Sequence, residues 1–198
     1  ATHVRRYRSN VAVASWTYPA SNKLLFEGAM SMQLMPWWNR PQPGVSDTTT
    51  AVQELSTNTY YRAPLGLQDY WTNNFYYRFA SSYVTGSHSF KVGEQFSSGW
   101  VVNRQFANGD LIEQYRGIPG QGGVPTQVTV YNTPTFNKTN LDADLGIYIQ
   151  DTWKLNRVTL SPGLRYDLMR QSVAATSMPA GRFVPARSFA EIPRVADW

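Results

Sequence analysis

LGIYIQDTWKLNRVTLSPGLRYD, residues 145–167, is the stretch that decides the fold of this chain. Apolar side chains alternate with polar ones on both sides of a turn at Asn156 and Arg157, which is the period of a β-strand. The alternation continues from Asp142 to Arg170, so each strand has about 14 residues, whereas strands of soluble proteins have roughly 5 or 6. Tilted by about 40°, such a strand spans roughly 35 Å. This length predicts a transmembrane β-barrel.

The two faces of this hairpin differ in polarity. The apolar face carries Leu145, Ile147, Ile149, Trp153, Leu155, Val158, Leu160, Leu164, Tyr166 and Leu168. The other face carries Asp144, Gly146, Tyr148, Gln150, Thr152, Lys154, Thr159, Ser161, Gly163, Arg165 and Asp167. In a barrel the first set would meet lipid and the second would line the lumen.

Composition agrees with this fold class and excludes others. The chain has 198 residues, of which 42% are apolar and 14% aromatic, and no stretch approaches the roughly 20 apolar residues of a membrane helix. It contains no Cys, which excludes disulfide frameworks, thiol catalysis and Cys-based metal sites. The net charge is +5, but the basic residues are scattered along the chain, so nucleic acid is not an expected partner. Surface arginines would instead pair with lipopolysaccharide phosphates.

Two earlier segments repeat the long hairpin. We expect hairpins over about 7–37, 71–101 and 142–171, with long extracellular loops over about 36–70, 103–141 and 171–198. Every tight turn then lies on one side, which would be periplasmic. The stretches 52–61 and 128–131 are interpreted as hairpins above the membrane, and 188–198 as a segment without strand alternation.

Aromatic residues lie where interfacial anchors are needed. Those expected at the membrane interfaces are Trp16, Tyr18, Trp71, Tyr83, Trp100 and Trp153. Two acidic residues, Glu94 and Asp151, fall on the apolar faces in strict register. A carboxylate in hydrocarbon is costly, so we expect a β-bulge or an interfacial depth at both positions.

Candidate functional side chains lie in the loops and on the polar faces. Ligand contact is expected from aromatic and basic loop residues, although anchoring or loop packing explains them equally well: Trp37, Trp38, Arg40, Tyr60, Tyr61, Tyr115 and Arg116. The expected lumen-facing polar residues are Arg78, Lys91, Tyr148, Gln150, Arg165 and Asp167.

Catalytic chemistry is not predicted. His3 and His88 are the only histidines and lack metal-ligand spacing, so no metal site and no cofactor are expected. The glycine-rich stretch 117–123 lacks the Lys-Ser/Thr of a phosphate loop and is interpreted as an outer loop.

The run 145–167 closely resembles a barrel hairpin of TonB-dependent outer-membrane transporters. Segments 15–18, 22–27 and 86–93 resemble earlier parts of the same proteins, in the order of the Oar-like branch. The resemblance implies a 22-stranded barrel in the outer membrane of a Gram-negative bacterium, filled by a plug domain that contacts the TonB complex, and import of a large or scarce ligand such as a glycan, peptide or chelate. Residues 1–198 show no plug domain, TonB box or closing strand, so we expect an interior fragment with about six strands and an open sheet.

A secreted, soluble β-rich carbohydrate-binding module is the alternative. It would bury Leu145, Ile147, Trp153, Leu160 and Leu164 between two packed sheets. A barrel fragment would leave the same side chains exposed on one curved sheet.

Overall fold

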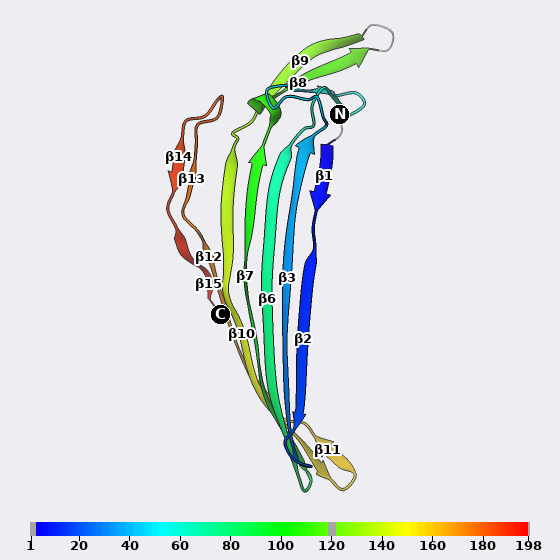
Figure 1. Cartoon of the computed structure of the whole chain (residues 1–198), viewed down its shortest axis with the longest axis vertical. Coiled ribbons are helices and arrows are strands. Elements are labelled where there is room, and N and C mark those ends of the chain that lie inside the picture. The colour runs from blue at the N-terminus through cyan, green and yellow to red at the C-terminus, as the bar shows by residue number, and fades with distance from the viewer. Residues whose placement is uncertain (1–2, 119–121, 198) are drawn as a thin grey trace.

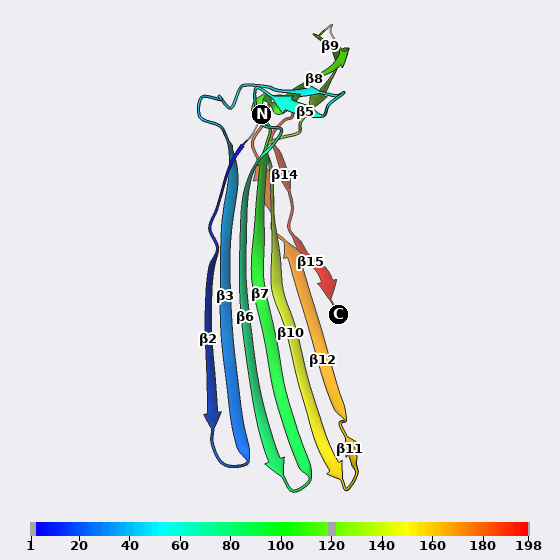
Figure 2. The ribbon, with the colours of Figure 1, turned by 90° about the vertical axis from the view of Figure 1, so that its right-hand side faces the viewer.

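The computed structural model describes residues 3–118 and 122–197, and these form an antiparallel sheet of very long strands (Figures 1 and 2). The nine-stranded sheet has the order β1-β3-β6-β7-β10-β12-β15, with β2 also paired to β3 and β11 to β10. Its strands are β1 (His3–Tyr7), β2 (Asn10–Pro19), β3 (Leu24–Pro41), β6 (Leu67–Thr85), β7 (His88–Phe106), β10 (Thr135–Leu155), β11 (Val158–Leu160), β12 (Gly163–Val173) and β15 (Ile192–Asp197). Within the described ranges the sheet does not close on itself.

Tight turns join the long strands at one end, called here the turn end. The turns are at residues 20–23, 86–87 and 156–157, and Figure 2 shows them side by side. The opposite end, called the loop end, carries the long connections. β1 and β2 pair with β3 in succession, β6 pairs with β7, and β11 and β12 pair with β10 in succession, so the strands form three long hairpins.

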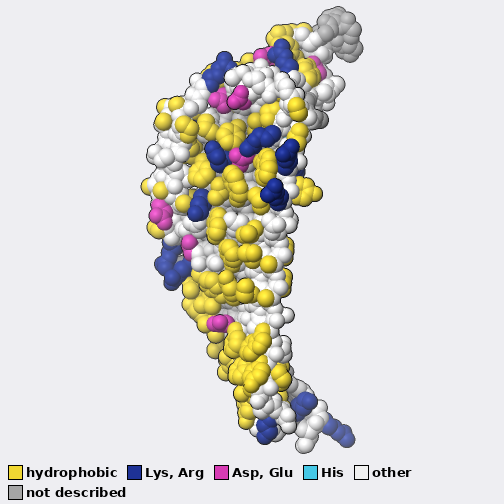
Figure 3. Space-filling view, in the orientation of Figure 1, with side chains coloured by type: hydrophobic (Ala, Val, Ile, Leu, Met, Phe, Trp, Pro, Cys, Tyr) yellow, Lys and Arg dark blue, Asp and Glu magenta, His cyan; other side chains and the backbone are white. Residues whose placement is uncertain are grey.

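The structure confirms an exposed apolar band on a single sheet. Residues directly opposite one another on neighbouring strands form a row and share a face. One apolar row is Ala14, Met30, Tyr77, Phe96, Leu145 and Leu168. Ile147, Leu160 and Leu164 are 45%, 44% and 75% exposed, and Leu145 and Trp153 are partly exposed. Figure 3 shows the hydrophobic side chains as a band along the visible face. Such a face is what a barrel wall presents, and it argues against a soluble module.

The other face of the sheet is polar. One of its rows is Thr17, Glu27, Ala80, Gly93, Tyr148 and Arg165. The sheet therefore separates an apolar surface from a polar one with a single layer of backbone, which is the arrangement of a barrel wall between lipid and lumen.

A smaller sheet lies above the loop end (Figures 1 and 2). It joins two hairpins from different connections, β4 (Ala51–Glu54) with β5 (Thr59–Tyr61), and β8 (Leu111–Ile118) with β9 (Gly122–Val130). Strands β4 and β8 pair in parallel. Ala51, Ala63 and Ile112 form its buried core. The two connections are thereby held together as one structure.

The long strands extend beyond the ends that alternation indicated. β3 continues to Pro41, β6 begins at Leu67 and β7 ends at Phe106. β10 begins at Thr135, seven residues before Asp142. Beyond the apolar band polar and aromatic side chains occur on both faces, so backbone pairing continues there without an alternating pattern in the sequence.

The segment 188–198 departs from expectation. Alternation was not visible there, yet β13 (Thr176–Met178) pairs with β14 (Arg187–Phe189), and β15 returns along β12. β15 contains Pro193, which lacks a backbone donor, and its pairing with β12 shifts register between Gln171 and Val173. An irregular strand of this kind leaves no two-residue period, and Trp198 lies outside the described residues.

The two acidic residues on the apolar face differ in setting. Asp151 lies near the turn end, where its carboxylate is 2.6 Å from His88 Nδ1 and accepts the Ser89 N–H at 3.1 Å. This place near the turn end favours the expected interfacial depth, which stays a prediction. Glu94 is exposed in an unbroken ladder between Phe79 and Ile147, so no bulge is present there, and the alternative expectation of an interfacial depth stays a prediction. The register shift of β10 falls instead between Leu141 and Asp144.

Replacing Glu94 by Leu is predicted to stabilise the barrel. The carboxylate interrupts an apolar row, and its removal should raise the free energy of unfolding by about 1 to 2 kcal/mol. Chemical unfolding of the complete receptor in lipid vesicles measures this. Glu27→Leu is the control, because Glu27 lies on the polar face and pairs with Lys91 Nζ at 3.1 Å. Equal or lower stability of Glu94→Leu would show that Glu94 does not face lipid.

Candidate functional site: the polar face and its loop end

The turn half of the polar face carries ionic contacts. Lys91 Nζ lies 3.1 Å from Glu27, and Arg165 Nη2 lies 2.7 Å from Asp167. The phenol ring of Tyr148 lies over Gly93, so closely that a Cβ atom added at residue 93 would overlap the ring. Four of the six predicted lumen residues therefore contact other groups of the same face.

Arg78 is the exception among these cations. It lines a hollow of about 590 Å³ together with Gln95, Ser97, Asp144 and Arg165. The Ser97 hydroxyl donates to Asp144 at 3.0 Å. Within the described part of the chain no ion pair is found for Arg78. The sixth residue, Gln150, lies opposite Lys91 and Gly163 on the same face.

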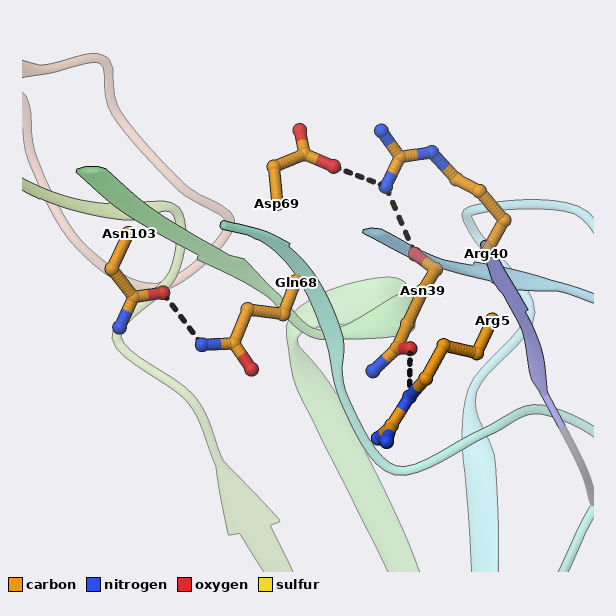
Figure 4. Close-up of polar contacts among 6 residues, drawn as sticks. All are labelled: Arg5, Asn39, Arg40, Gln68, Asp69 and Asn103. Carbon is orange, nitrogen blue, oxygen red and sulfur yellow. Dashed lines mark hydrogen bonds and ion pairs between the residues drawn. The ribbon is translucent and has the colours of Figure 1, made fainter. Parts of the chain in front are cut away.

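The loop half of the polar face has a different character. The Trp37 and Tyr70 rings stack with centroids 5.2 Å apart, and the Arg5 guanidinium lies 5.3 Å from the centre of the Trp37 ring. Arg5 Nε donates to Asn39 Oδ1 at 3.1 Å. Gln68 Nε2 donates to Asn103 Oδ1 at 2.7 Å (Figure 4). These contacts fix aromatic and amide groups at the loop end.

The candidates Trp38 and Arg40 do not join Trp37. Trp38 follows Trp37 on the same strand and therefore points to the opposite face, in a row with Arg6, Asp69 and Arg104. Arg40 Nη1 lies 2.5 Å from a carboxylate oxygen of the buried Asp69 (Figure 4). This ion pair gives Arg40 a structural role at the end of β3.

The remaining ligand candidates lie in the small sheet. Tyr60 and Tyr61 belong to β5, and Tyr115 and Arg116 belong to β8. Gln53 Nε2 donates to the Tyr60 hydroxyl at 2.7 Å, and the Tyr115 hydroxyl donates to Glu113 at 3.3 Å. Tyr61 and Arg116 are exposed. The small sheet thus brings these four residues together but keeps them apart from Trp37.

Glu54 joins the two hairpins of the small sheet. Its carboxylate accepts the Gly117 N–H at 2.7 Å and the Ser56 N–H at 3.0 Å. These backbone hydrogen bonds, the Gly117 bond foremost, lower the pKa of Glu54 below its usual value of 4.5. The Glu54 carboxylate is therefore ionised at neutral pH. Its hydrogen bonds weaken only as the pH falls through the lowered pKa of Glu54.

The predicted interfacial aromatics all lie on the apolar face. Trp16 stacks on Tyr18 at 5.8 Å, and Trp100 packs against Phe75 at 5.9 Å. Tyr83 and Trp153 lie toward the turn end, and Trp71 toward the loop end. Their assignment to membrane interfaces stays a prediction that this arrangement favours.

Sequence reasoning missed five residues of the loop-end cluster: Arg5, Asn39, Gln68, Tyr70 and Asn103. Strand parity could have found them. The odd positions of β3 and β7 and the even positions of β6 stay on the polar face up to these residues.

Residues 3–118 and 122–197 offer neither a metal site nor a membrane helix. No cluster of three or more His, Asp or Glu side chains there could hold a metal ion. No helix in these ranges is long and apolar enough to cross a membrane.

A curved single sheet with one apolar and one polar face, tight turns at one end and long connections at the other defines the wall of a transmembrane β-barrel. Residues 5–191 match the model of the TonB-dependent receptor-like β-barrel. The chain therefore belongs to this family, whose members are outer-membrane transporters rather than enzymes. Searches of curated proteins and of solved structures gave no match.

Proposed function

We propose that this chain forms part of the barrel wall of a TonB-dependent importer in the outer membrane of a Gram-negative bacterium. The observation that carries the proposal is the separation of the exposed apolar band from the ion-bearing polar face on one layer of strands. The apolar face meets lipid and the polar face lines the lumen. Ligand enters from the loop end, and a plug domain contacting TonB occupies the lumen.

Basic residues beyond the apolar band support an outer-leaflet contact. Arg6 and Arg104 lie in the row of Asp69, and Lys138 lies opposite Val102 in the row of Trp71. Lys138 Nζ lies 5.8 Å from the centre of the Trp100 ring. Cations within and just beyond an aromatic belt match the height of lipid phosphates. Lipopolysaccharide is therefore the proposed lipid partner at the loop end.

Membership of the Oar-like branch and import of a large or scarce ligand belong to the same proposal. The support is the paired small sheet, which holds two long connections above the lumen as one platform. Tyr60, Tyr61, Tyr115 and Arg116 of this platform would make the first contacts with a ligand.

Cysteine labelling in intact cells tests the orientation. The segment contains no Cys, so Thr57→Cys in the β4–β5 turn and Ser87→Cys in a tight turn each introduce one thiol into it, at exposed positions. A membrane-impermeant maleimide should modify the first variant in intact cells and the second only after the outer membrane is opened. Labelling of both variants in intact cells, or of Ser87→Cys alone, would contradict the proposal.

A further inference from the structure

The polar face divides into two zones of different chemistry. Toward the turn end it carries charged side chains: Glu27, Arg78, Lys91, Asp144, Arg165 and Asp167. At the loop end, one row contains Tyr7, Trp37, Tyr70, Asn103 and Asn137. The next row contains Gln68, Gln105 and Thr135. The second zone thus consists of aromatic rings and neutral side chains, mostly amides.

Arg5 is the cation of this loop-end zone, and the zone's rows contain no carboxylate. The guanidinium is already engaged, because Nε donates to Asn39 and the group lies over Trp37. Asn39 is only 6% exposed, so this contact anchors Arg5 in the wall. A ligand at this surface meets little free charge of either sign.

Two amides are joined by a hydrogen bond beside the aromatic stack. Tyr70 and Asn103 are direct cross-strand neighbours, so the Gln68–Asn103 hydrogen bond lies next to the Trp37–Tyr70 stack. That bond uses one N–H of Gln68 and the oxygen of Asn103. Gln68 Oε1 and Asn103 Nδ2 thereby remain as an acceptor and a donor at the edge of the stack.

We propose that this surface is a subsite for a neutral, hydroxyl-rich ligand, a saccharide. Each sugar hydroxyl both donates and accepts, which suits planar amides, and the C–H face of a pyranose ring packs on an aromatic ring. An anionic chelate would need free cations, and a cationic peptide would need carboxylates. The assignment rests on the proposed import function and names its substrate class.

A binding experiment with the complete receptor tests the subsite. Labelled receptor in detergent is applied to an array of neutral oligosaccharides, uronic-acid oligosaccharides and hexapeptides. Neutral oligosaccharides should bind, and Trp37→Ala should weaken this binding at least 10-fold. Trp38→Ala is the matched control, because it removes the neighbouring indole from the opposite face and should leave binding within about twofold. Gln68→Leu should weaken binding while the barrel stays folded.

Two results would overturn the assignment. One is binding to peptides or uronic acids without binding to neutral oligosaccharides, or binding to nothing on the array. The other is equal binding by Trp37→Ala and Trp38→Ala. Either result leaves the cysteine-labelling pattern unchanged, so failure of the subsite is distinguishable from failure of the proposed membrane function.

Discussion

Replacing Met30 by Arg should largely prevent assembly of the folded barrel. Met30 is 54% exposed and lies in a row of apolar side chains that includes Tyr77 and Phe96. This row lies about midway between the rows of Trp153 at the turn end and Trp71 at the loop end. An arginine facing lipid at the bilayer midplane costs about 2 to 4 kcal/mol. Such a cost lowers the folding equilibrium constant roughly 30- to 1,000-fold.

The matched control is Gln33→Arg on the same strand. Gln33 lies on the polar face opposite Val11 and Asn74, where a guanidinium keeps its water. The amount of protease-resistant receptor in isolated outer membranes compares the two variants. Met30→Arg should be strongly depleted and Gln33→Arg close to wild type. Equal amounts of the two variants would mean that the two faces have been assigned to the wrong sides.

The fold was predictable where lipid imposes a pattern. Between Leu145 and Leu168 the side chains of one face are apolar except Asp151 near the turn, because a polar side chain in lipid would lose its water without gaining a partner. The sequence therefore records the strand period, the turn at 156–157 and the face of each residue. Glu94 breaks the pattern, and of the two explanations expected for it, a bulge or an interfacial depth, the regular pairing of β7 with β10 excludes the bulge.

The loop end was less predictable because the strands there do not separate lipid from water, so nothing imposes an alternating sequence pattern on them. Polar side chains lie on both faces of the strands there. Thr135 and Asn137 of β10, for example, do not differ in hydrophobicity from loop residues. The pairing of β4 with β8 joins residues about 60 positions apart, a contact that local patterns do not encode. Trp37 and Trp38 were grouped by sequence proximity, whereas the strand period places them on opposite faces.

Replacing Gly99 by Ala should lower the free energy of unfolding of the barrel. Strand propensity alone predicts the opposite. Ala normally stabilises a strand relative to Gly by roughly 0.5 to 1 kcal/mol. At Gly99, however, a Cβ atom would overlap the backbone oxygen of Asn73 and lie 3.0 Å from Asn74 Oδ1. Backbone cannot rotate away as a side chain can, so β6 and β7 must separate locally.

This separation should cost about 1 to 3 kcal/mol of unfolding free energy. The position adds to the effect, because Leu141, opposite Gly99 on β10, borders the register shift of that strand. Disturbing Gly99 therefore disturbs three neighbouring strands where their pairing is already irregular. Chemical unfolding of the receptor in lipid vesicles measures the loss.

Gly28→Ala is the control, because its Cβ would meet Trp16 at an ordinary 3.6 Å. This variant should be neutral or slightly stabilised, as propensity predicts. If Gly99→Ala were as stable as Gly28→Ala, the close approach of β6 to β7 at Asn73 would not exist. Comparison of the two variants thus shows whether close backbone packing requires glycine at residue 99, whereas the apolar face has room for alanine at residue 28.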